Sequence, residues 1–130
     1  DICYAVGLVC RNQSNQGPAH WKAVKRILRY LKETTDYTLC YQSSDLYLVG
    51  YCDADWGGDL DERKSTSGYA FLLSDDAISW SSKKQSCIAL STMKAEFVAC
   101  SSAVQEAVWL RRFHQHLDVG THTLDPETIH

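Results

Sequence analysis

The sequence predicts an α+β fold in which a sheet is covered on one face by helices. Three observations lead to this prediction. Helical patterns open the chain, short runs that alternate apolar and polar residues fill its middle, and a long helical pattern follows near residues 91–117. Alternation with a period of two indicates half-buried strands, whereas a period of 3.6 indicates an amphipathic helix. Strands that are grouped and then followed by a long helix are typical of an α+β fold.

Two short helices are predicted before the sheet. The first covers residues 2–11, and the second begins after Gly17-Pro18 and covers about 19–33, since proline is tolerated at a helix start. The apolar stripe of the second helix should face inward, and it consists of Trp21, Val24, Leu28 and Leu31. Its other side is basic, with Lys22, Lys25, Arg26, Arg29 and Lys32. A solvated helix face explains such a charge run as well as a phosphate contact does.

Four strands are predicted from the alternating runs. They lie near residues 37–42, 46–54, 69–73 and 77–82, with turn-like residues at 42–45 and 74–76. The polar segment 56–67 contains Gly57-Gly58 and should form a loop. Several antiparallel strands in a row therefore precede the long helix.

Acidic residues on the second strand and on the long helix suggest a cation site. Asp53 and Asp55 project to the same side of their strand, roughly 7 Å apart. At helical spacing Glu96 shares a stripe with Cys100, Ala103, Ala107 and Leu110, so we expect its carboxylate to point inward and to need a partner. A hard divalent cation such as Mg²⁺ would satisfy both sets of acids. The alternatives are a turn signal at the strand end and a salt-bridged glutamate.

Composition limits the classes of function. With 130 residues the chain is long enough for one domain with a core. Its net charge of −3 gives no overall electrostatic argument for nucleic-acid binding, and no apolar run is long enough to cross a membrane. Six irregularly spaced cysteines without a C-x-x-C pair argue against a zinc site. We expect reduced thiols and a cytoplasmic or nuclear location.

Several sequence blocks resemble one family in collinear order. Residues 50–56 (GYCDADW), 63–69 (RKSTSGY) and 78–85 (ISWSSKKQ) are similar to consecutive blocks of the ribonuclease H domain of copia-type LTR retrotransposon Pol polyproteins. Residues 90–97 and 109–112 continue the resemblance. Upstream, residues 1–6 and 26–32 resemble the end of the preceding reverse transcriptase. The resemblance implies a helical reverse-transcriptase end at 1–36 and a partial ribonuclease H-like domain, with a mixed sheet, at 37–130.

The resemblance also implies a nuclease that cuts the RNA strand of an RNA–DNA hybrid with Mg²⁺, or alternatively Mn²⁺. By motif, Asp53 and Glu96 match two of the family's four metal-binding catalytic carboxylates. Ser91 and Thr92 match positions that contact the minor groove of the hybrid. The residues expected to contact the nucleic-acid backbone are Arg63, Lys64, Ser65 and Thr66. The alternative role for these four residues is hairpin chemistry, that is, forming the loop of the hairpin.

Two departures from the family pattern bear on activity. The third and fourth acids lie in motifs that this chain lacks, and neither Asp118 nor Asp125 matches them. The domain is therefore expected to be C-terminally truncated, just where a further strand should start, with weak or absent Mg²⁺ binding. The second departure is Lys94, where the family has glutamate; Lys94 should face solvent and weaken the helix start.

Two functions remain open at this point. One is a ribonuclease H-like domain, and the other is a domesticated, non-catalytic module that binds protein or nucleic acid. The second is favoured for the isolated chain. An open sheet edge would also allow a partner chain or self-association.

Overall fold

The chain consists of two compact units, Asp1–Leu39 and Cys40–His130. The computed structural model describes residues 1–41, 47–117 and 128–129. The boundary between the units lies three residues beyond the one expected from the sequence, and each unit is described here by itself.

The first unit is a pair of helices, α1 (Cys3–Cys10) and α2 (Pro18–Glu33). Pro18 begins α2 as predicted, and the backbone N–H of Gly17 donates a 3.0 Å hydrogen bond to Nδ1 of His20 at the helix start. The prediction that the apolar stripe of α2 faces inward is wrong for most of its residues, because Trp21 is 59% exposed and Leu28 57% exposed. A helix as short as α1 offers too little surface to cover a stripe of four large residues, and neither of these fully described helices buries a residue.

The second unit contains a mixed sheet, as the family resemblance implied. Its described strands are β1 (Leu48–Asp55), β2 (Thr66–Leu73), β3 (Asp76–Lys84) and β4 (Thr128–Ile129). They lie in the order β3-β2-β1-β4. The first three are antiparallel neighbours, whereas β4 runs parallel to β1 opposite Val49 and Gly50. The strand expected to start at the end of the chain is therefore present.

One predicted strand is wrong. Residues 37–41 form no strand, and the remainder of that prediction, the turn at 42–45 and Leu46 lie outside the described residues. All five side chains from Tyr37 to Tyr41 are exposed, so their alternating pattern has no buried face to hold it against a sheet. Tyr41 instead donates a 2.8 Å hydrogen bond from its hydroxyl to the carbonyl oxygen of Ala77.

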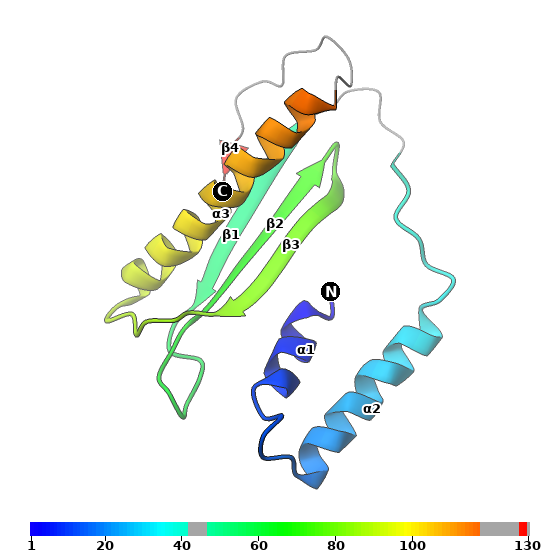
Figure 1. Cartoon of the computed structure of the whole chain (residues 1–130), viewed down its shortest axis with the longest axis vertical. Helices are drawn as coiled ribbons and strands as arrows, with labels where there is room; N and C mark the ends of the chain where they lie inside the picture. Colours follow the sequence, from blue (N-terminus) through cyan, green and yellow to red (C-terminus); the bar gives the residue numbers. More distant parts are fainter. Residues whose placement is uncertain (42–46, 118–127, 130) are drawn as a thin grey trace. The chain divides into compact units, whose positions relative to one another are not determined.

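Helix α3 (Thr92–His116) lies along one face of the sheet, against β1 and β2 (Figure 1). Its buried residues are almost all small, and they are Ala95, Ala99, Ala103, Ala107 and Leu110. The core between helix and sheet contains Leu48 and the fully buried Phe71. Gly50 of β1 makes room for the Phe71 ring, because a Cβ at this glycine would lie 2.5 Å from Cε1 of the ring. The small residues let α3 approach β1 closely.

Candidate metal centre

Asp53 lies near the end of β1, on the face of the strand opposite α3. Strand alternation directs Cys52 and Ala54 toward the helix, and Asp53 and Asp55 away from it. The carboxylate of Asp53 is exposed, and its Oδ1 accepts a 2.8 Å hydrogen bond from the backbone N–H of Ala54. Asp55 is also exposed and packs against Gly58, where a Cβ would collide with Oδ2 of the acid. Gly58 therefore lets the loop after β1 pass close to this carboxylate.

Glu96 is exposed, which corrects the expectation that its carboxylate points into the core. Cys100 is exposed too, although the other members of the predicted stripe, Ala103, Ala107 and Leu110, are buried. The buried stripe starts at Ala95 and Ala99. Each step of four residues moves the stripe by about 40° around the helix, because a turn holds 3.6 residues. Glu96 consequently falls at the edge of the stripe near the start of α3.

Cys52 directly precedes Asp53 on β1. Its side chain packs against the core from the helix-facing side of β1. Burial raises the pKa of the Cys52 thiol; the neighbouring Cys100 thiol and the carboxylates of Glu96 and Asp53 raise it further. The two acids come from β1 and α3, the two elements expected to carry them. However, Asp53 is directed away from the helix that carries Glu96, so the predicted convergence of the two carboxylates is not seen.

The carboxylates of Asp53 and Glu96 suit a hard cation, but they are few. Exposed carboxylate oxygens are the ligands that Mg²⁺ and Mn²⁺ prefer. Within residues 1–41, 47–117 and 128–129, no group of three or more histidine, cysteine, aspartate or glutamate side chains is arranged to hold a metal ion. If only Asp53 and Glu96 bound the ion, water would fill most of its coordination positions. Mg²⁺ often keeps several water ligands in proteins.

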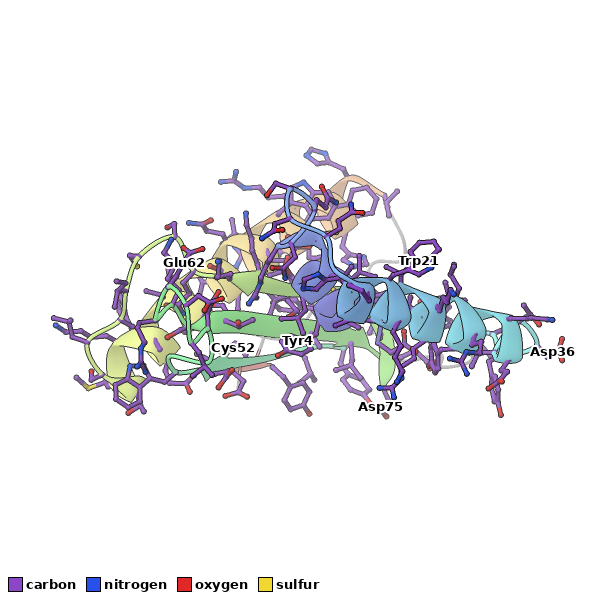
Figure 2. The ribbon with its side chains drawn as sticks, turned by 90° about the horizontal axis from the view of Figure 1, so that it is seen from below. Tyr4, Trp21, Asp36, Cys52, Glu62 and Asp75 are labelled. Atoms are coloured by element: carbon purple, nitrogen blue, oxygen red, sulfur yellow. The ribbon has the colours of Figure 1, made fainter. Side chains whose placement is uncertain are left out.

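The loop between β1 and β2 contains an ion-pair network that the sequence did not indicate. The Lys84 ammonium lies 2.9 Å from Oδ2 of Asp59 and 2.5 Å from Oε1 of Glu62, a residue that projects from the loop (Figure 2). Asp59 Oδ1 also accepts the backbone N–H groups of Asp61 and Glu62. The hydrogen bond from Lys84 and those from the backbone lower the pKa of Asp59 to about 2. Asp59 and Lys84 are 25 residues apart, so no local pattern could pair them.

Comparisons with known proteins place the chain among mobile elements. It is 54% identical over 117 residues to the retrovirus-related Pol polyprotein from transposon TNT 1-94 of Nicotiana tabacum, covering 90% of this chain and 9% of that protein. It is 39% identical over 111 residues to the Pol polyprotein from transposon RE2 of Arabidopsis thaliana, covering 85% of this chain and 8% of that protein. It is also 50% identical over 111 residues to secreted RxLR effector protein 161 of Plasmopara viticola, covering 85% of this chain and 78% of that protein.

The chain is similar to Pol polyproteins of retrotransposons, and this similarity supports a retrotransposon Pol origin. This segment of Pol origin spans about a tenth of the length of the transposon polyproteins that it matches. No protein-family model and no solved structure matches it. None of the helices in the described part of the chain is long and apolar enough to cross a membrane.

Two of the four predicted backbone-contact residues in the Pol segment are buried, which corrects that expectation for them. Ser65 is fully buried, and its Oγ accepts a 3.1 Å hydrogen bond from the backbone N–H of Gly57. Thr66 is 8% exposed and begins β2. Both hydroxyls lie where the loop closes, which agrees with the alternative of hairpin chemistry. The Lys64 ammonium nitrogen lies 2.6 Å from Oε2 of Glu62. Arg63 is exposed, and its backbone adopts a left-handed conformation with φ of 56°.

Ser91 and Thr92 lie at the start of α3. The Ser91 hydroxyl caps the helix by accepting a 3.3 Å hydrogen bond from the backbone N–H of Lys94. Thr92 and Lys94 are exposed, and the first turn of α3 contains no acidic residue. The solvent-facing position of Lys94 is confirmed. A minor-groove role for Ser91 and Thr92 stays a prediction.

Gln85, the last residue of the sequence block 78–85, has a structural role that its motif did not indicate. Its side chain is 5% exposed, and its Nε2 donates hydrogen bonds to Oγ of Ser67 (2.8 Å) and to the carbonyl oxygen of Ala95 (3.0 Å). Its backbone N–H donates to the carbonyl oxygen of Ser65. Gln85 therefore ties the start of β2 to the first turns of α3, one residue before Glu96.

Proposed function

We propose that this Pol segment is a ribonuclease H-like domain whose Asp53 and Glu96 bind Mg²⁺, or Mn²⁺, next to the RNA strand of an RNA–DNA hybrid. The observation that carries the proposal is that the two acids are exposed and lie on β1 and α3, two elements that pack against each other. When bound, the metal would activate water and stabilise the departing oxygen of a phosphodiester.

The residues of the Pol segment have separate tasks in this proposal. Asp53 and Glu96 supply negative oxygen ligands at an exposed surface that a hybrid can reach. The Ala54 N–H holds one carboxylate oxygen of Asp53 and leaves the other for the metal. Gln85 fixes the first turns of α3 to the sheet and so sets the height of Glu96. Arg63 and Thr92, both exposed, remain the proposed contacts to the nucleic-acid backbone and to the minor groove.

We expect the 130-residue chain to cleave a hybrid weakly or not at all. Two carboxylates bring two negative charges where the family uses four. Removing one member of a group of catalytic residues that act together commonly lowers the rate by orders of magnitude. Binding of Mg²⁺ should weaken for the same reason, because each carboxylate contributes charge and a coordination position.

A non-catalytic binding module is the second candidate function. The observation in its favour is that a short relative exists, of which this chain covers 78% and which the chain matches at 50% identity. The sheet edge offers a surface for a protein partner or a second copy. Among the described residues, β4 pairs with β1 only at Val49 and Gly50, so the part of β1 from Cys52 to Asp55 has a strand neighbour on one side.

The deciding experiment combines metal binding with hybrid cleavage. The wild-type chain, Asp53→Asn and Glu96→Gln are titrated with Mn²⁺ and followed by electron paramagnetic resonance. Each is then incubated with a labelled RNA–DNA hybrid and Mg²⁺ or Mn²⁺. Asp36→Asn is the matched control, because it removes an exposed carboxylate from the other unit.

The enzyme proposal expects both site variants to lose Mn²⁺ binding and any residual cleavage, whereas Asp36→Asn keeps both. Hybrid binding without cleavage, unchanged in the two site variants, would instead support the binding module. Equal Mn²⁺ affinity in all four proteins would refute the metal site.

A further inference from the structure

Strand β3 forms a second edge of the sheet, on the side away from β1. The strands lie in the order β3-β2-β1-β4, so β3 is the last strand on its side (Figure 1). Among the described residues it forms a ladder with β2 alone, over Asp76–Lys84. The Tyr41 hydroxyl binds the carbonyl oxygen of Ala77 near the start of the strand. An edge of this kind presents backbone N–H and C=O groups with which an added strand can pair.

The middle of β3 carries neither the charges nor the proline that commonly protect an edge strand. Residues 77–82 read AISWSS and lie between Asp76 at one end and Lys83 at the other. The Ser79 hydroxyl donates a 2.7 Å hydrogen bond to Oε1 of Glu106, which holds this part of the strand against α3. A strand that is already ordered loses less conformational entropy when it binds a partner. The edge is therefore prepared for an added strand.

The charged ends of β3 are arranged symmetrically about Trp80. Three ladder pairs define this symmetry, and they are Asp76–Leu73, Trp80–Ala70 and Lys83–Ser67. Trp80 is therefore three ladder positions away from each of the two charged residues. The symmetry depends on a bulge at Ile78, which has no ladder partner. Without this extra residue, two side chains seven residues apart would point to opposite faces of the sheet.

An antiparallel second copy of β3 complements this arrangement of charge. When the two-fold axis passes through Trp80, each Asp76 lies opposite Lys83 of the other copy, on the same face of the sheet. The dimer then has two contacts between opposite charges. A parallel copy would place Asp76 beside Asp76 and Lys83 beside Lys83, which is unfavourable. Lys83 is exposed, whereas Lys84 already belongs to the ion-pair network of the loop.

We propose that β3 is a homodimer interface, at which two copies of the chain pair antiparallel and join their sheets, with the two Trp80 side chains opposite each other. Trp80 is 48% exposed and lies on the face away from α3, because its ladder neighbour Ala70 is in turn opposite Tyr51. Pairing removes part of both indoles from water, and aromatic side chains directly opposite each other stabilise a strand pair. The interface uses neither Asp53 nor Glu96, so it goes beyond the proposed function and does not depend on it.

The test measures self-association of the whole 130-residue chain by sedimentation velocity over a range of protein concentrations. The single variants Asp76→Lys and Lys83→Glu each create like charges at both contacts. The double variant exchanges the two charges and restores opposite pairs. Arg112→Glu is the matched control, because Arg112 is exposed on α3 in the same unit and the net charge changes by the same amount as in Lys83→Glu. Hydrogen exchange at low and high protein concentration locates the interface.

We expect the wild-type chain, Arg112→Glu and the double variant to dimerise. Each single variant should dissociate with a constant at least about tenfold higher, because like charges in contact across an interface are strongly unfavourable. An equimolar mixture of the two single variants should form a mixed dimer, since its contacts again join opposite charges. The amides of β3 should gain protection at high concentration.

Three results would overturn the proposal. The first is a wild-type chain that stays monomeric at every concentration. The second is a dimer that survives both single charge reversals unchanged, because such a dimer uses another surface. The third is protection that appears along β1 instead of β3, which would assign self-association to the opposite edge of the sheet. The double variant and the mixture keep the test decisive if one single variant folds poorly.

Discussion

The substitution Gly50→Ala should destabilise the second unit by overfilling the core between β1 and α3. An added Cβ would lie 2.5 Å from Cε1 of Phe71 and 3.1 Å from two further ring atoms. Phe71 is fully buried and is held by Leu48 and by the alanines of α3, so its ring has little room to turn. Overfilling a packed core costs about 1–3 kcal/mol. For a domain of this size each kcal/mol lowers the melting temperature by about 4–8 °C.

A second substitution should restore part of this loss. Phe71→Leu alone removes ring volume from the core and should cost about 1–3 kcal/mol. In the double variant the methyl group introduced by Gly50→Ala occupies space that the smaller side chain leaves. The double variant should therefore be more stable than the sum of the two single effects predicts, by at least about 1 kcal/mol.

The assay is urea unfolding followed by tryptophan fluorescence. Three of the four tryptophans, Trp56, Trp80 and Trp109, lie in the second unit and report on it. Gly68→Ala is the control, because a Cβ there would meet only the Ser81 carbonyl oxygen at an ordinary 3.6 Å. It should change the free energy of unfolding by less than about 0.5 kcal/mol. If Gly50→Ala were as mild as Gly68→Ala, or if Phe71→Leu gave no rescue, the close packing of the Phe71 ring over Gly50 would be wrong.

Three further predictions concern the helix start and the loop. Ser91→Ala should lower the free energy of unfolding by about 1 kcal/mol in urea, because the Lys94 N–H loses its acceptor; an unchanged midpoint would contradict the cap. Lys94→Glu should raise stability by roughly 0.3–1 kcal/mol at low salt, and Lys94→Gln by less, because an acid in the first turn favours the helix dipole; an equal response of both variants would argue against an electrostatic origin. The pKa of Asp59 is lowered from 3.8 to about 2 in the folded chain, so its contribution is present above about pH 4 and is lost as the pH falls toward 2. Melting temperatures between pH 5 and pH 2 should show this loss, and Lys84→Met should reduce it because the main cause of the shift is the Lys84 hydrogen bond.

The regular elements of the second unit were predictable because their patterns are local. Alternation identified the strands that became β1, β2 and β3, and helical periodicity identified α3 to within a residue at each end. The failure at residues 37–41 has a physical cause, since alternation alone does not reveal whether any surface exists to bury one side. The inward stripe of α2 failed for the same reason, because its large residues find too little surface on α1.

The candidate site was predictable only in part. Asp53 and Glu96 were selected by motif resemblance, while periodicity assigned Glu96 the wrong environment because the stripe drifts around the helix. Burial of Ser65 and Thr66 could not be seen from their hydroxyl chemistry, which suits both a phosphate contact and a closed loop. The pairing of Asp59 with Lys84 depends on how the loop folds back toward the end of β3, and that is a property of the tertiary structure.

The absence of a buried residue in the two fully described helices α1 and α2 has a consequence for local stability. Helices of 8 and 16 residues are marginal in water unless packing supports them. Their amides should exchange with deuterium far faster than those of β1 and β2, whose ladder is shielded by α3. A brief exposure to protease should accordingly release residues 1–39 first and leave the sheet with its long helix as the resistant fragment.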